Sequence, residues 1–235
     1  MIPSGHDIDQ VMDFVREHHI PLSLVTPYVT NEGLKKWKKV IEKVAEKNPK
    51  SEVIFNDWGI YRVIKSLSGE LEPVLGRLMT KIKRGPRLMN VLDNLPPDAI
   101  KHLQSTNLSV SAYRKFLVER DITRVELDHP FQDITLNDVG SDLHLSLYMP
   151  FAYVTTTRFC LVASCDVPER KGMVGIFPCK KECQKYTFCL DNPIMPCTLI
   201  RKGNTIFYKN EKIPKANELK EKKIDRLVIQ PEIPI

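Results

Sequence analysis

Helical and strand-like patterns alternate along this chain, and that alternation limits the folds open to it. Apolar residues recur at helical spacing over 7–18 and 31–47, and a short apolar run follows each segment. The pattern predicts helices at 7–18, 31–47, 58–67 and 109–121, and strands at 21–29, 51–56, 73–79, 122–128, 142–150 and 226–230. Strands that alternate with helices favour a parallel sheet joined by crossover helices.

The length and composition suit a fold of this kind. With 235 residues, of which 42% are hydrophobic, the chain can bury one sizeable core. We predict a TIM-barrel-like α/β fold in which residues 1–150 form a partial barrel, because the strands are fewer than a full barrel requires. Residues 151–235 are expected to add a cysteine-rich, metal-binding region and closing strands in one compact unit, with a hairpin that turns at Gly203 and Asn204.

The cysteines are confined to one part of the chain. All six lie within 38 residues, separated by four, thirteen, three, five and seven residues, at Cys160, Cys165, Cys179, Cys183, Cys189 and Cys197. Thiolates are the soft ligands that select zinc or an iron-sulfur cluster. Short chain separations also lower the entropy cost of bringing several thiolates together. The spacing therefore predicts a metal centre in this region.

Several interpretations of the cysteines remain open. Disulfides need an oxidising compartment, and the first ten residues show neither a positive segment nor a long apolar run that would direct the chain there, so we expect a cytoplasmic protein. Structural zinc usually shows paired CxxC motifs or histidine ligands, whereas all six histidines lie outside the cysteine stretch. An iron-sulfur cluster needs four thiolates, which CKKEC at 179–183 and cysteines on either side could supply. The remaining thiols are then expected to pack as small hydrophobic residues.

Polar residues at the predicted strand ends are the candidates for a catalytic site. In a parallel barrel, the active site lies at the carboxyl ends of the strands, which nominates Asn56, Asp57, Arg77 and Glu126. Asp57 could equally cap the helix that follows it, and Glu126 could pair with Arg77 or Arg124. Thr26, Tyr28, Asp128, Tyr148 and Tyr153 occupy similar positions.

The charge is uneven, with a net value of +6. Residues 201–226 contain nine Lys or Arg against four Asp or Glu, and 76–88 contain five bases and no acid. Such runs can follow nucleic-acid phosphates, although they are more often solvated surfaces. No apolar run is long enough to predict a membrane span, and the common nucleotide-binding, zinc-protease and serine-hydrolase motifs are absent.

Taken together, several short motifs resemble the collagenase-like peptidase family. They are RFC at 158–160, CKKEC at 179–183, NDWG at 56–59, GRLMTK at 76–81 and RVELD at 124–128. The resemblance implies a TIM-barrel-like domain with a cysteine-bound 4Fe-4S cluster. It also implies a part in oxygen-independent hydroxylation of ubiquinone precursors or RNA bases. A small aromatic or RNA substrate and a partner protein of the same family are therefore expected.

The resemblance also suggests a ligand set. Cys160, Cys179 and Cys183 match its single cysteine followed by a cysteine pair. The fourth ligand does not transfer cleanly, and we expect Cys197, with Cys189 as the next choice. The alternative function is that of a peptidase, in which the cysteines are structural or nucleophilic and zinc replaces the cluster.

Overall fold

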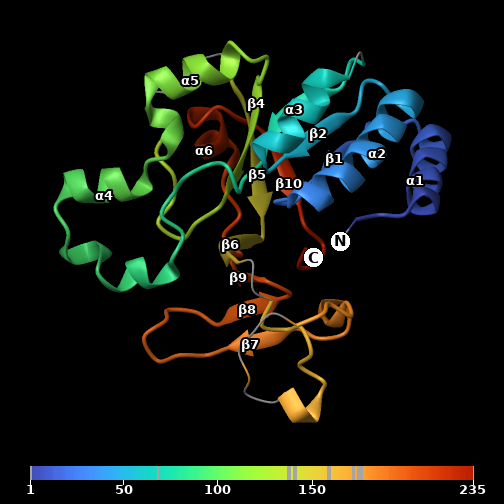
Figure 1. Ribbon diagram of the computed structural model, residues 1–235. Helices are drawn as coiled ribbons and strands as arrows, with labels where there is room; N and C mark the ends of the chain where they lie inside the picture. The colour runs from blue at the N-terminus through green and yellow to red at the C-terminus, as the bar shows by residue number, and fades with distance from the viewer. Residues whose placement is uncertain are drawn as a thin grey trace. The chain divides into compact units, whose positions relative to one another are not determined.

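A computed structural model of the chain describes residues 2–67, 69–136, 139, 142–157, 160–170, 173 and 177–234. It is a mixed α/β protein, as the alternating pattern predicted (Figure 1). Its helices are α1 (Gly5–His18), α2 (Asn31–Lys47), α3 (Trp58–Ser66), α4 (Pro97–Gln104), α5 (Ser111–Val118) and α6 (Ala216–Glu221). Its strands are β1 (Ser23–Val25), β2 (Glu52–Phe55), β3 (Glu72–Leu75), β4 (Arg124–Asp128), β5 (His144–Met149), β6 (Phe151–Thr156), β7 (Phe188–Leu190), β8 (Leu199–Lys202), β9 (Thr205–Lys209) and β10 (Ile224–Ile229).

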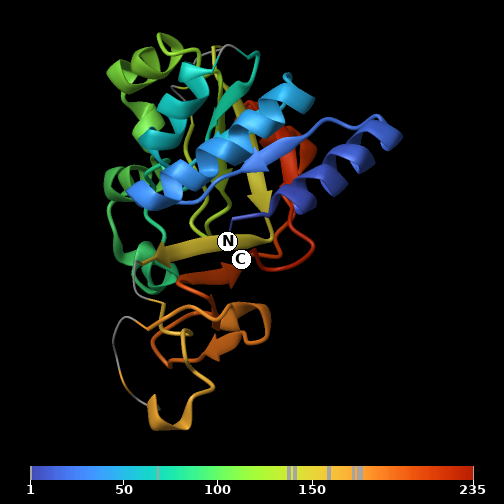
Figure 2. The ribbon, with the colours of Figure 1, turned by 45° about the vertical axis from the view of Figure 1, so that its right-hand side comes forward.

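The strands form two sheets. Six strands are hydrogen-bonded in the order β1-β2-β3-β4-β5-β10, and this sheet is curled into a half-barrel. The pairs β1-β2, β2-β3 and β3-β4 are parallel, so the partial, barrel-like α/β fold expected from the sequence is confirmed. The second sheet has the order β6-β9-β8-β7, and its neighbouring strands are antiparallel. Turned by 45°, Figure 2 shows the same strands from a second side.

Contacts within the chain divide it into two compact units, each built from several segments. The first unit comprises Met1–Lys81, Asn107–Leu127 and Asp138–Leu145, and the second comprises Ile82–Thr106, Asp128–Asn137 and Ser146–Ile235. Figure 1 labels the elements of each unit. Residues 1–150, which the sequence analysis assigned to the barrel, thus contribute to both units.

The first unit is held together by apolar side chains of its strands and helices. Ile41 and Val44 of α2 and Val53 of β2 are fully buried. An aromatic group adds Phe55, Trp58, Tyr61 and Phe116, with ring centroids 5.2 to 5.6 Å apart for the pairs that involve Trp58 or Phe55. Such pairs contribute about 0.5–1.5 kcal/mol each beyond the area they bury.

In the second unit, the cysteine-bearing segment is associated with the antiparallel sheet. The hairpin predicted at Gly203 and Asn204 is present, since β8 and β9 pair antiparallel on either side of it. Gly203 has φ +61°, a left-handed conformation that glycine adopts without steric strain. A Cβ atom there would lie 3.4 Å from Cβ of Cys183, so the turn also passes close to a cysteine.

Some elements differ from the sequence expectation. Strand β3 ends at Leu75 rather than at residue 79, because the chain turns through Gly76, where the Met79 N–H donates to the Gly76 carbonyl at 2.9 Å. Short elements were not predicted, namely α4, α6, β6 and β7. Among the described residues, no helix combines the length and the hydropathy that crossing a membrane requires.

Candidate functional site

Three of the nominated polar residues lie along one edge of the six-stranded sheet. The register pairs Phe55 with Leu75 and Leu75 with Val125, across β2, β3 and β4. Asn56 follows Phe55 directly, and Arg77 follows two residues after Leu75. Glu126 follows Val125 inside β4, two residues before that strand ends. Because these strands are parallel, their carboxyl ends meet at the same edge, where parallel α/β folds hold ligands.

Asn56 is part of the scaffold of this edge. Its side chain is 4% exposed; Nδ2 donates to the Thr26 carbonyl at 2.7 Å, and Oδ1 accepts from the Leu78 N–H at 3.0 Å. The amide therefore connects the segments that follow β1 and β3. Gly76 makes room for it, since a Cβ atom there would lie 2.3 Å from Oδ1 of Asn56.

Arg77 and Glu126 are both buried at the same edge. The hydroxyl of Thr80 donates to the backbone carbonyl of Glu126 at 3.0 Å and ties the segment after β3 to β4. Arg124, which was considered as a partner for Glu126, has an ion pair with Glu52, with Nε and Oε1 3.7 Å apart. A catalytic role for Arg77 and Glu126 remains a prediction from their position.

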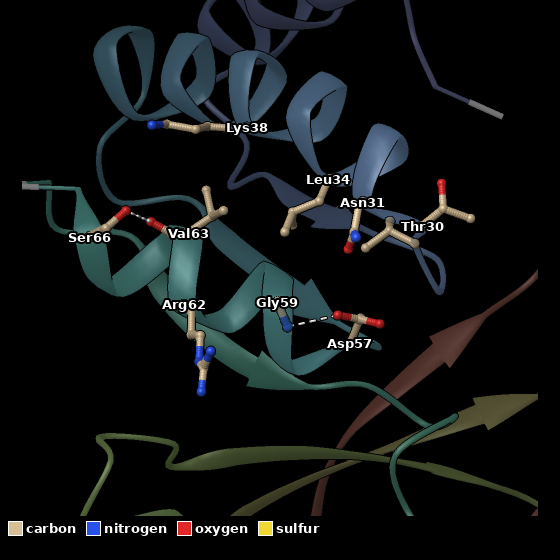
Figure 3. A pocket seen from close by; sticks show the side chains of 10 residues that line it. Thr30, Asn31, Leu34, Lys38, Asp57, Gly59, Arg62, Val63 and Ser66 are labelled. Carbon is tan, nitrogen blue, oxygen red and sulfur yellow. Dashed lines mark hydrogen bonds between the residues drawn. The ribbon is translucent and has the colours of Figure 1, made fainter.

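Asp57 serves a different part of the first unit. Its Oδ1 accepts the N–H of Gly59 at 2.7 Å and caps α3, which was the structural alternative considered from the sequence. The same residue lines a groove of about 550 Å³ between α2 and α3 (Figure 3). This volume lies within the range of about 300–1,000 Å³ that is common for small-molecule sites.

In the second unit, the structure reveals a polar cluster around Asp128 that the sequence did not predict. Arg84 forms an ion pair with Asp128, and its guanidinium carbon lies 3.7 Å from the ring centroid of Tyr153. The N–H of Tyr153 donates to Oδ1 of Asp128 at 3.2 Å. Burial raises the pKa of Tyr208, and the charge of Asp128 raises it further. Asp128 and Tyr153 were nominated from strand ends, whereas Arg84 was visible only as part of a basic run.

All six cysteines are free thiols of the second unit; Cys189 lies in strand β7, and the other five lie in the segments between strands. Cys160 and Cys165 flank a compact turn, in which Ala163 donates to the Cys160 carbonyl and Cys165 to the Val162 carbonyl, both at 3.1 Å. Cys179 and Cys183 flank a second turn, CKKEC. Cys197 belongs to a later turn, and its charge acts on Tyr208 of β9.

Glu182 joins the first two of these turns. Its side chain is 3% exposed; Oε1 accepts from the Ser164 N–H at 2.6 Å and Oε2 from the Lys180 N–H at 3.0 Å. Burial alone would raise the pKa of Glu182, but these backbone donors outweigh burial and lower it. Glu182 is therefore a charged acceptor that brings the two turns together.

The thiols of these turns influence one another. Burial raises the pKa of Cys183, and the nearby thiols of Cys179 and Cys160 raise it further. Within the described part of the chain, no three His, Cys, Asp or Glu side chains are placed to hold one metal ion. Arg158 and Phe159, which belong to the RFC motif, lie outside the described residues.

No protein-family model, curated protein or solved structure matches this chain.

Proposed function

We propose that this chain is an iron-sulfur protein that takes part in oxygen-independent hydroxylation, or a related redox modification, of an aromatic ring or an RNA base. The reaction class comes from the motif resemblance. The observation that supports a metal centre is the pair of cysteine-bearing turns joined by Glu182. Glu182 thereby holds the turn of Cys160 and Cys165 close to that of Cys179 and Cys183, as a ligand shared by both turns would require.

The donor set suits a cluster better than a single ion. Four thiolates on two turns match the ligands of an iron-sulfur cluster. In a 4Fe-4S cluster each cysteine binds a different iron, so the sulfur atoms surround the cluster rather than one ion. When bound, the cluster would supply electron transfer to the reaction.

Because Glu182 joins the two turns, we favour Cys165 as the fourth ligand, in addition to Cys160, Cys179 and Cys183. The family resemblance suggested Cys197, then Cys189. Cys165 ends the turn whose Ser164 N–H is bound by Glu182, whereas Cys197 follows a turn in which the Met195 N–H donates to the Asn192 carbonyl at 2.9 Å. The choice between Cys165 and Cys197 is open to direct test.

The test is anaerobic purification followed by iron, sulfide and zinc analysis of six single Cys→Ser variants. We expect iron and sulfide in the parent protein, loss of both on substitution of Cys160, Cys165, Cys179 or Cys183, and retention in Cys189→Ser. Loss of iron in Cys197→Ser with retention in Cys165→Ser would restore Cys197, the choice that the resemblance suggested. A colourless protein that contains zinc, or metal-free protein that cleaves peptides, would overturn the proposal in favour of a peptidase with structural cysteines.

The reaction class needs its own assay. A deletion strain and its parent are grown without oxygen, and their quinones and modified nucleosides are compared. We expect one hydroxylated product to be missing from the deletion strain and restored by the parent gene but not by the Cys160→Ser variant. Identical pools would refute the hydroxylation proposal, whatever metal the protein holds.

A further inference from the structure

The groove between α2 and α3 has opposite charges at its two ends and apolar side chains between them, with Arg62 of α3 along one side. Thr30, Asn31 and Asp57 lie at one end, and Lys38 and Ser66 lie at the other (Figure 3). Between them, Leu34 of α2 and Val63 of α3 form the floor. All of these residues belong to the first unit, so the groove is complete within it.

The groove is kept open by the sequence of the two helices. One side of α2 carries Asn31, Leu34 and Lys38 at helical spacing, and the N-cap Thr30 precedes them. Gly59 has the corresponding place at the start of α3, where a Cβ atom would lie 2.8 Å from Oδ1 of Asp57 and 3.2 Å from Cδ2 of Leu34. A larger residue there would close the groove at its acidic end.

The charges at the two ends are available to a ligand. Asp57 uses Oδ1 to cap α3, and Oδ2 has no hydrogen-bond partner among the residues that the structure describes. Lys38 has one distant neighbour, with Nζ 3.8 Å from Oε1 of Glu42, and both side chains are about half exposed. Such an exposed pair contributes little and is readily exchanged for another partner.

From this arrangement we propose that the groove binds a small zwitterionic molecule. Its ammonium group pairs with Oδ2 of Asp57, its carboxylate pairs with Lys38, and an aliphatic segment between them lies over Leu34 and Val63. A wholly anionic ligand would meet the carboxylate of Asp57, and a wholly cationic one would meet Lys38 and Arg62, which also lines the groove. Charge complementarity therefore favours a molecule that carries both charges, separated by an apolar chain.

The spacing of the charges limits the length of this chain. Asn31 and Lys38 are separated by seven residues of α2, which corresponds to about 10 Å along the helix axis. Figure 3 shows the Lys38 side chain extended away from Asp57, and rotation about its bonds would bring Nζ closer and shorten the gap that a ligand must span. We therefore expect γ-aminobutyrate to be too short, and ε-aminocaproate or ω-aminocaprylate to reach both ends.

The test is titration of the full-length, isotope-labelled protein with these three amino acids, followed by nuclear magnetic resonance. We expect chemical-shift changes at Leu34, Gly59 and Val63, and a dissociation constant on the order of 1 mM for the best probe, as befits a small ligand at an exposed site. Caproate and n-hexylamine, which carry one charge each, should bind about threefold or more weakly, because each lacks one of the two ion pairs.

Two variants and a matched control examine the charged ends. Asp57→Ser keeps an oxygen that can cap α3 but removes the negative charge, and Lys38→Met removes the positive charge. Each is expected to weaken ε-aminocaproate or ω-aminocaprylate binding about threefold, whereas Lys39→Met, a neighbouring exposed lysine outside the groove, is expected to have no effect. Equal binding of the zwitterion and the singly charged probes, or equal effects of Lys38→Met and Lys39→Met, would overturn the proposal. Neither outcome depends on iron in the second unit.

Discussion

Replacement of Asn56 by alanine is expected to lower the free energy of unfolding, because its buried amide bonds two backbone groups. The substitution leaves the Thr26 carbonyl and the Leu78 N–H without the partners that now lie at 2.7 and 3.0 Å. A buried polar group left without a partner costs about 1–3 kcal/mol, so two of them give about 2–6 kcal/mol. For a chain of this size, that corresponds to a fall in Tm of about 4–24 °C.

The assay combines thermal unfolding, followed by circular dichroism, with hydrogen exchange of the Leu78 amide. Exchange separates local opening of this edge from unfolding of the second unit, which matters because a chain of two units need not unfold in one step. Asn94→Ala, at an exposed position, is the control and is expected to unfold like the parent. A Tm within about 1 °C of the parent, or an unchanged Leu78 exchange rate, would refute the scaffold role of Asn56.

Asn56→Asp extends the same test. An ionised carboxylate can still accept from Leu78 but would face the Thr26 carbonyl without a proton to donate. The variant is therefore expected to be less stable than the parent at neutral pH, and to recover part of the loss as acidification protonates Asp. No recovery on acidification would indicate that the Thr26 contact contributes nothing.

Three further changes should give distinct results. Gly59→Ala is expected to lower the free energy of unfolding by about 1 kcal/mol, although alanine has a higher helix propensity than glycine, because the added Cβ displaces the Asp57 cap. A free energy of unfolding equal to or above that of the parent, measured in urea, would contradict this. Glu182→Gln is expected to speed amide hydrogen exchange at Ser164 or Lys180, since one acceptor oxygen is lost. The control Glu169→Gln, at an exposed position, should leave exchange at both amides unchanged. Equal exchange rates in the two variants would contradict the role of Glu182 in joining the two turns. Burial lowers the pKa of His129 in the folded state. As pH falls, the histidine is therefore protonated in the unfolded state before it is protonated in the folded state. The free energy of unfolding should then decline below about pH 7. His129→Gln should flatten that decline, as measured by unfolding at several pH values, and an unchanged slope would exclude His129 as its source.

The burial and the charged neighbours of His129 explain why this histidine is expected to determine the pH dependence of stability. Its side chain is 5% exposed, and Nδ1 has no hydrogen-bond partner among the described residues. Asp133 and Glu218 raise the pKa of the ring, but burial, Lys212 and Lys222 lower it more. The neutral form is therefore the one that the folded second unit accommodates.

The sequence predicted the first unit well because its signals are local. Apolar runs and helical stripes identified β1, β2, β4, α1, α2 and α3, and only their ends were misplaced by a few residues. The end of β3 was wrong because the turn at Gly76 packs against Asn56, a residue that follows another strand, β2. Short elements such as α4 and α6 carry too few residues to show a periodic pattern.

Side-chain roles were harder to predict because they depend on distant partners. Arg84 and Asp128 are separated by 44 residues, so nothing in the basic run at 76–88 indicated an ion pair. Glu182, in the middle of CKKEC, has the sequence context of an exposed residue and is instead buried by contacts with Ser164. In both cases the partner is supplied by tertiary structure.

The polar residues at the carboxyl edge of the first unit therefore differ in what they can contribute to binding. One N–H and the amide oxygen of Asn56 are already bonded to the backbone, and a ligand that competed for them would have to break buried hydrogen bonds. Asp57 satisfies α3 with one oxygen and leaves the other facing the groove, so a ligand can bind there without disturbing the cap. Within the first unit, Asp57 is therefore better placed than Asn56 to bind a ligand, because capping α3 leaves one of its carboxylate oxygens unused. The buried Asn56, whose polar atoms bond the backbone, has a scaffold role instead.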